Sequence, residues 1–568
     1  MYEFLGGTDG AKATATYIVG TDGWSDYSEP SPPSLLPEYL ESGMEVERSL
    51  WDRDSLIVDV DLEYENFDSP AAAWLNPERA FGLQVPVLEA TLRILGDAGV
   101  DPLVLASGRG FHLVWAIARN SRAFRRLAQF GRVPPTLEAR YSESCSQSGA
   151  KVDSDLGHAY AGLGLILEFV GHRVLAASAV ACSVPVQLTA IEVGPGPAGR
   201  EIVSFDISEY GDPLDGRHIR LPFSAYLKPR RAEWLLGKAG AAQLLPIFEI
   251  RLDGMTLRNA IDAARDPAKT IEIARHVATR IQDQSDSMEN LIDEYRASEL
   301  ADFHDRFYSA PWSSEPFSAA SQPGSIADAP PCVTWLLQHP NPWLLKPAAL
   351  QHVARVLTAL DWHPRAIAQL IFARYQTDCG WGETWTQLDP LNRAVFYTRL
   401  FTGMIATQSD KLIDLNCVSH QEKGYCNVPE CFSNLVPYRN KLLERRLSLS
   451  DWAVGLSTGC FWQTSIFDCL EDIRNSGFGR IEICSWPAHL DYHDPDRVRH
   501  AAHLIEDLGL ETYSFHAPFS DHIDITSPDR QAREFALKEL LQAAEAAAIL
   551  NTCKRRTRRV RCPLPIPS

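Results

Sequence analysis

The first 235 residues alternate short apolar runs with polar stretches, and one longer segment carries apolar residues at helical spacing. Short apolar runs bounded by polar and turn residues predict strands. The longer segment, from about Ala80 to Ala98, predicts a helix because Leu88, Leu92 and Leu95 recur on one face. The pattern therefore predicts a mixed α/β domain. Its expected strands are 55–61, 102–106, 112–117, 164–170 and 201–206.

The pattern changes several times further along the chain. Residues 236–308 read as a helical extension, and 309–331 are rich in Pro, Ser and Ala, as linkers are. A second helical region is expected over 332–447. From residue 452 to 551 strands and helices alternate, which is typical of a (β/α) barrel, although only three strands are present. The basic segment 552–568 lacks apolar periodicity and is expected to be a disordered tail.

Composition fits an α/β multidomain globular protein. The chain has 568 residues, 45% hydrophobic and 22% charged, with a net charge of −19. That charge argues against a basic coat for non-specific nucleic-acid binding, but it allows a local basic groove. Neither an apolar stretch of about 18 residues nor a signal peptide is recognisable, so we expect a cytoplasmic protein without a membrane partner. The 12 cysteines do not resemble a secreted disulfide framework.

Two short motifs follow the first predicted strands. In Val58-Asp59-Val60-Asp61, the period of a strand places both carboxylates on one face, an arrangement suited to Mg²⁺ or Mn²⁺. In Ser107-Gly-Arg-Gly-Phe-His112, two glycines allow close backbone approach to a ligand. Ser107, Arg109 and His112 supply donors for phosphate oxygens. Metal-binding carboxylates followed by a phosphate grip indicate nucleotidyl transfer.

The two motifs resemble motifs I and II of the archaeo-eukaryotic primase superfamily. Asp206, at the end of Ile202-Val-Ser-Phe-Asp206, is similar to that family's third motif, and Arg220 and Lys228 match the segment after it. The resemblance covers about residues 45–235. It implies that residues 1–235 form a domain like the primase small subunit, with an RRM-like mixed sheet.

The resemblance also implies the chemistry. Asp59, Asp61 and Asp206 would hold two Mg²⁺ or Mn²⁺ ions, and Ser107, Arg109 and His112 would bind the triphosphate. Arg220 and Lys228 would add charge next to nucleotide or template. The expected function is that of a DNA primase or polymerase, making primers for DNA replication or repair. Its partners would be single-stranded DNA, nucleoside triphosphates and other replication or repair proteins.

Four cysteines form a second candidate site. Cys332 begins a helix in Pro-Pro-Cys, and about eighty residues later comes Cys417-x8-Cys426-x4-Cys431. The region resembles the iron–sulfur domain of the primase large subunit, over about 330–435, which implies a [4Fe–4S] cluster. The last three cysteines are more closely spaced than in that family. A Zn²⁺ site and unligated cysteines therefore stay open as alternatives, with Cys379 as a possible substitute ligand.

The C-terminal βα units resemble xylose-isomerase-like and endonuclease-IV-like TIM barrels. His516, in Phe515-His-Ala-Pro-Phe519, follows the third strand, where the family has a metal-binding His. A truncated barrel lacks the other ligands, so His516 is expected to be a vestige. A sugar-phosphate isomerase or epimerase, or an abasic-site endonuclease, is the rival function, and a non-catalytic nucleic-acid-binding protein is the third hypothesis.

Overall fold

The computed structural model describes most of the chain. The described residues are 1–142, 154–192, 200–211, 218–252, 254–312, 325–376, 389–426, 428, 431–449, 455–476 and 478–550. They form a mixed α/β structure with several sheets, and no sheet among them closes into a barrel. The chain divides into two compact units, Met1–Glu444 and Arg445–Ser568. The predicted α/β multidomain class is confirmed at this level; Cys379 and the basic tail lie outside the described residues.

A six-stranded sheet lies at the centre of the first unit. Its order is β6-β7-β3-β5-β4-β9, and every neighbouring pair is antiparallel except β6 and β7. Four of the five predicted strands are confirmed as β3, β4, β5 and β7. The strands are β3 (Ser55–Asn66), β4 (Leu103–Ala106), β5 (Gly110–Ala118), β6 (Val186–Gln187), β7 (Glu201–Asp206) and β9 (Ile250–Arg251).

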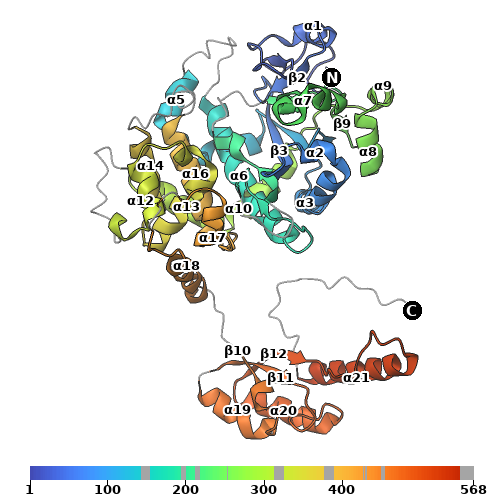
Figure 1. Cartoon of the computed structure of the whole chain (residues 1–568), viewed down its shortest axis with the longest axis vertical. Helices are drawn as coiled ribbons and strands as arrows, with labels where there is room; N and C mark the ends of the chain where they lie inside the picture. The colour runs from blue at the N-terminus through green and yellow to red at the C-terminus, as the bar shows by residue number, and fades with distance from the viewer. Residues whose placement is uncertain are drawn as a thin grey trace. The chain divides into compact units, whose positions relative to one another are not determined.

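One face of β3 is apolar and packed. Val58, Val60 and Leu62 alternate on this face and are fully buried. Helices α3 (Pro77–Asp97) and α6 (Ser154–Ser178) pack against the sheet (Figure 1). The predicted helix at 80–98 is α3, which begins three residues earlier because Asn76 caps it and Pro77 occupies its first turn.

The fifth predicted strand, 164–170, was wrong, because these residues lie inside α6. A short apolar run is compatible with a buried strand or with a buried helix, and periodicity cannot separate them when every side is covered. By length and composition, α6 alone among the described helices could cross a membrane, and 72% of its most apolar window is buried inside the fold.

A second sheet and several helices complete this part of the first unit. The small sheet has the order β1-β2-β8 and is antiparallel. Strand β9 falls within the segment expected to be helical from residue 236, and it pairs with β4. The elements are β1 (Ile18–Thr21), β2 (Glu45–Ser49), β8 (His218–Arg220), α1 (Leu36–Glu41), α2 (Ala72–Leu75), α4 (Arg122–Phe130), α5 (Pro135–Ser142), α7 (Glu233–Gln243), α8 (Leu257–Ala264) and α9 (Pro267–His276).

The cysteine-containing region is helical and shares its core with the sheet region. One cluster of buried apolar residues runs from Phe4 to Leu435. The region expected to be a separate domain therefore packs within the first unit. Its helices, with the two that precede the expected linker, are α10 (Ser285–Arg296), α11 (Glu299–Ser309), α12 (Pro331–Gln338), α13 (Pro347–Ala359), α14 (Pro364–Tyr375), α16 (Pro390–Ala406), α17 (Cys417–Glu422) and α18 (Val436–Leu449).

A buried ion pair joins the two regions. Glu168 lies in the middle of α6 and is fully buried, and Nε of Arg399 on α16 donates to it at 3.0 Å. His304 Nε2 lies 3.2 Å from the same carboxylate. Burial disfavours the charged carboxylate, but Arg399 and His304 outweigh it and lower the pKa of Glu168 to about 2. The stabilisation is therefore complete above the ordinary pKa of 4.5 and is lost as the pH falls towards 2.

The second unit contains three βα pairs. Strands β10, β11 and β12 are parallel and adjacent in that order, and the unit has its own apolar core. Helices α19 and α20 pack side by side (Figure 1). The predicted order of strands and helices is confirmed. The elements are β10 (Gly455–Ser457), α19 (Ile466–Asn475), β11 (Arg480–Cys484), α20 (Pro495–Asp507), β12 (Glu511–His516) and α21 (Arg530–Ile549).

We expect Arg399→Met to destabilise the first unit by roughly 3–5 kcal/mol, because it leaves the Glu168 carboxylate buried without its cation. Urea unfolding of the full chain measures this change. Arg173→Met is the matched control. Arg173 lies on α6, the helix that carries Glu168, and forms an ion pair with the half-exposed Glu294. Losing this pair should lower the free energy of unfolding by less than about 1 kcal/mol. Equal effects of the two substitutions would contradict the assignment of Glu168 and Arg399 as the buried tie.

Candidate active site

Four acidic residues occupy alternate positions on the polar face of β3. They are Asp59, Asp61, Glu63 and Glu65, so the pair seen in the motif is half of a longer ladder. Strand β7 pairs with β3 only from Asp61 onward, so Asp59 has no partner from β7. The Tyr210 hydroxyl binds the backbone of Asp59 in place of that strand. It accepts from the Asp59 backbone N–H at 3.0 Å and donates to the Asp59 carbonyl at 2.8 Å. Tyr210 thereby fixes the backbone at the first acidic position.

The sheet register brings three of the predicted residues together. Asp61 lies opposite His112 of β5 on one side and opposite Asp206 of β7 on the other. Directly opposed residues of antiparallel strands share a face. His112 Nδ1 also lies 3.1 Å from Oδ2 of Asp59. Three strands, β3, β5 and β7, thus place Asp59, Asp61, Asp206 and His112 on one surface.

The electrostatics of Asp61 favour a bound cation. Burial is the main cause that raises the pKa of Asp61 well above its usual value, and Glu63, Asp59 and Asp206 add repulsion. Its Oδ1 is buried and has no hydrogen-bond partner within the described structure. Oxygen ligands with excess negative charge are what Mg²⁺ and Mn²⁺ bind. The residues present therefore fit the expected divalent cation.

A buried glutamate adjoins this surface from the edge of the sheet. Glu249 directly precedes β9 and is fully buried, and its Oε1 has no hydrogen-bond partner among the described residues. Burial raises the pKa of Glu249 to about 7, while His112 and Arg220 oppose that rise. Glu249 is therefore a neighbour of the site whose protonation responds near neutral pH.

Arg109 and Lys228 lie over the far end of the ladder. Nε of Arg109 donates to Glu63 at 2.9 Å, and Nη1 lies 2.9 Å from Glu65. Nζ of Lys228 lies 4.0 Å from Glu63. Burial opposes ionisation of Glu63, but Arg109 and Lys228 outweigh it and lower its pKa to about 2. The side chains of both cations keep some exposure, 23% for Arg109 and 35% for Lys228, which leaves them accessible to an anion.

Ser107 and the two motif glycines shape the turn between β4 and β5. The Ser107 hydroxyl donates to the Gly110 carbonyl and accepts from the Gly110 N–H, both at 3.2 Å. A Cβ on Gly110 would lie 1.8 Å from the Leu62 carbonyl oxygen, and one on Gly108 would lie 2.3 Å from the Tyr226 ring. The glycines were expected to admit a ligand; in the structure they admit protein neighbours.

Arg220 lies in a buried network of carboxylates in the small sheet. It is 3% exposed and contacts Glu45, Glu47 and Glu249, with Nε donating to Glu45 at 2.9 Å. Its guanidinium also lies 4.5 Å from the centre of the Tyr226 ring. The side chain expected to contact nucleotide or template is therefore engaged by protein groups, and it connects to the site through Glu249.

The four predicted cysteines gather in the helical region. Cys332 is buried, the other three are half-buried, and all four are free thiols. Burial is the main cause that raises the pKa of Cys332 to about 12, followed by the thiols of Cys431, Cys417 and Cys426. The other three thiols thus lie near enough to Cys332 to act on it electrostatically. Whether they hold a [4Fe–4S] cluster, Zn²⁺ or no metal stays a prediction.

His516 lies at the end of β12 in the second unit and is exposed. Its Nδ1 lies 3.0 Å from the Ala517 carbonyl, and its ring lies 5.3 Å from that of Phe519. In the part of the chain that the structure describes, it belongs to no group of three close metal-binding side chains. Asp59, Asp61 and Asp206 also belong to no such group among the described residues. Their assignment as metal ligands rests on the strand register and on the electrostatics of Asp61.

Comparisons with protein-family models, with curated proteins and with solved structures gave no match.

Sequence reasoning missed several residues of this surface. Glu63 and Glu65 were detectable, because the alternation that joins Asp59 to Asp61 continues through them. Tyr210, Tyr226 and Glu249 reach the site from the segments that connect the strands and helices. Nothing in their local sequence signals a contact so distant in the chain.

We expect the purified chain to bind Mn²⁺ and Asp61→Asn to weaken that binding at least about tenfold, a change of roughly 1.4 kcal/mol. The substitution keeps the shape of the side chain but removes the charge that draws the cation. Titration calorimetry without nucleotide measures the affinity. Asp97→Asn, an exposed carboxylate at the end of α3, is the control, and unaltered Mn²⁺ affinity in Asp61→Asn would exclude Asp61 as a ligand.

Proposed function

We propose that the first unit is a template-directed nucleotidyltransferase of the primase-polymerase kind. The observation that supports this proposal is the register of Asp61 between His112 and Asp206, with a buried carboxylate oxygen to which no described residue donates a hydrogen bond. Under this proposal the sheet corresponds to the RRM-like sheet of the archaeo-eukaryotic primases. The second unit corresponds to a partial (β/α) barrel of the xylose-isomerase-like kind.

The proposed reaction extends a primer on a single-stranded template. The oxygen of the primer 3′-hydroxyl attacks the α-phosphorus of a nucleoside triphosphate, and the bond from that phosphorus to the bridging oxygen of pyrophosphate breaks. The hydroxyl proton leaves to solvent, and pyrophosphate carries the negative charge away. Divalent cations at Asp59, Asp61 and Asp206 would supply activation of the hydroxyl and neutralisation of the phosphates.

The remaining side chains have roles that their positions support. Arg109 and Lys228 hold the β- and γ-phosphates, since they are the accessible cations beside the ladder. Glu63 and Glu65 orient the Arg109 guanidinium before the nucleotide binds. His112 holds Asp59 in place through its 3.1 Å contact. Arg220 acts as a positioning residue, because its partners are protein carboxylates.

We expect Asp59→Asn and Asp61→Asn each to lower primer extension about a thousandfold or more, because each removes a charged metal ligand from the reacting centre. A primed single-stranded template with Mn²⁺ and labelled nucleoside triphosphates measures the rate. The fold should persist, as circular dichroism would show, because neither carboxylate is part of the apolar core. Asp97→Asn should extend primers at the wild-type rate. Extension near wild type in either site variant would refute the proposed function.

We expect Arg109→Ala to weaken nucleoside triphosphate binding by about ten- to a hundredfold, the loss expected for one charge-assisted phosphate contact. Fluorescence anisotropy with a labelled nucleotide in the presence of Mg²⁺ measures the affinity. Arg93→Ala, which removes an exposed arginine from α3, is the control. If Arg109→Ala bound nucleotide as the wild type does, Arg109 would serve only to neutralise Glu63 and Glu65.

A further inference from the structure

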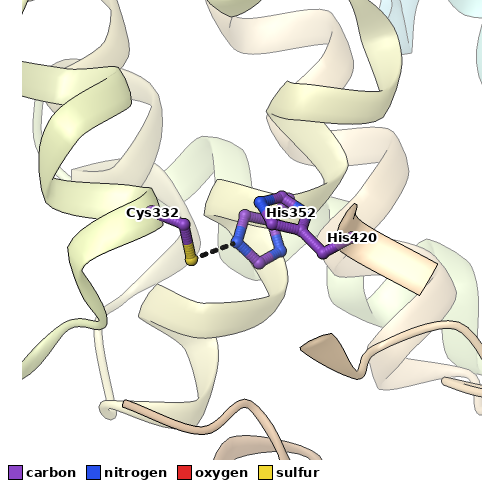
Figure 2. A group of neighbouring side chains, drawn as sticks. All are labelled: Cys332, His352 and His420. Atoms are coloured by element: carbon purple, nitrogen blue, oxygen red, sulfur yellow. Dashed lines mark hydrogen bonds between the residues drawn. The ribbon is translucent and has the colours of Figure 1, made fainter. Parts of the chain in front are cut away.

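Two histidines that the sequence analysis did not select lie beside Cys332. His352 and His420 are 6% and 5% exposed, and each offers a ring nitrogen within 4.8 Å of the Cys332 sulfur and of the other histidine. The Cys332 sulfur lies 3.3 Å from Nε2 of His352. Figure 2 shows Cys332 directed at the His352 ring, with His420 approaching from the other side. The two imidazole rings lie 4.0 Å apart.

This group is the only one of its kind among the described residues. No other three side chains of His, Cys, Asp or Glu in the described ranges bring their ligand atoms so close together. A second observation points to an absent partner: Nε2 of His420 is buried and has no hydrogen-bond partner in the described structure. Buried polar atoms are almost always satisfied, so an orphan nitrogen beside a thiol and an imidazole indicates a ligand.

The surrounding ion pairs hold the elements that carry the two histidines in place. Arg355 lies one turn after His352 on α13, and it donates to Asp410 at 2.7 and 2.8 Å and to Asp414 at 3.0 Å. Lys423, just after α17, also binds Asp414. These contacts fix the segment before α17 against α13, and Asn416 caps α17 by accepting from the Ser419 N–H at 2.9 Å. The approach of His420 to His352 is therefore built into the fold.

A fourth donor is available from the neighbouring thiols. Cys417 and His420 are three residues apart on α17, so their side chains face the same way. Cys426 and Cys431 come shortly after α17 in the chain. One thiolate from this group would complete four ligands of mixed sulfur and nitrogen. Tetrahedral sites of Cys and His are typical of structural zinc, whereas [4Fe–4S] clusters are usually held by four cysteines.

We propose that Cys332, His352 and His420, with one thiolate from Cys417, Cys426 or Cys431, bind a structural Zn²⁺ ion. The ion connects α12, α13 and α17, which are separated by up to about ninety residues of chain. Its role is to fasten the segment around α17 to the helical region, because a metal that binds only the folded arrangement contributes directly to stability. This inference does not depend on the proposed catalytic activity.

The test is the metal content of the full chain, purified without chelator and dialysed against a weak one. Elemental analysis should find about one zinc ion per wild-type chain, and the purified protein should be colourless. His352→Ala, His420→Ala and Cys332→Ser should each lower the zinc content per chain at least tenfold. One of the variants Cys417→Ser, Cys426→Ser and Cys431→Ser should do the same. His339→Ala is the matched control, because His339 is an exposed histidine in the same region that stacks on Trp335, and this variant should retain zinc.

Substitution by cysteine separates ligand loss from misfolding. His352→Cys and His420→Cys keep a zinc-binding atom, so each should retain zinc where the alanine variant does not. A strong chelator should lower the melting temperature of the wild type and leave that of His420→Ala unchanged. Brown protein whose iron and sulfide survive both alanine substitutions would overturn the proposal in favour of a four-cysteine cluster. Folded wild-type protein without metal after expression with added zinc would also overturn it.

Discussion

Repulsion between carboxylates on one face of β3 is the constraint on which the rest of the first unit depends. Four acidic side chains at alternate positions cannot all be buried and charged unless cations meet them. The chain supplies Arg109 and Lys228 to Glu63 and Glu65, and His112 to Asp59. Asp61 forms no ion pair with an arginine or lysine among the described residues. Burial raises its pKa well above the usual value, and the neighbouring carboxylates add to that rise while His112 opposes it. The opposite face of the same strand is apolar and buried from Leu56 to Leu62, so the strand cannot turn over to relieve the repulsion.

The elements around this strand could largely be predicted, because their apolar patterns are regular. Strands β3, β4, β5 and β7 and helix α3 follow from periodicity, and the βα order of the second unit follows in the same way. The misassigned segment at 164–170 lies in a helix that is apolar on nearly every side, where no period distinguishes the two structures. The two-residue strand β9 was missed because its extended conformation depends on pairing with β4 and not on its own sequence.

The residues of the candidate site also differ in how well the sequence predicts them, according to whether they lie on regular strands or on connections. Asp59, Asp61, Asp206 and His112 were predicted because each ends or lies within an apolar strand, and the register then brings them together. Glu249, Tyr210 and Tyr226 come from connections, and their approach depends on how the chain returns to the sheet. His352 and His420 are a similar case, because they lie in two different helices and only the fold brings them to Cys332.

Helix α6 has a consequence for how the chain is made. Its central glutamate finds its arginine partner 231 residues later in the sequence. At synthesis rates of about 5–20 residues per second, that partner emerges roughly 10–50 seconds after the helix. During this interval Glu168 lacks the arginine that allows it to be buried as a charged group, so the apolar segment around it cannot reach its final packing. The newly made chain is therefore exposed to aggregation and to capture by chaperones at this point, and α16 ends that exposure when it docks.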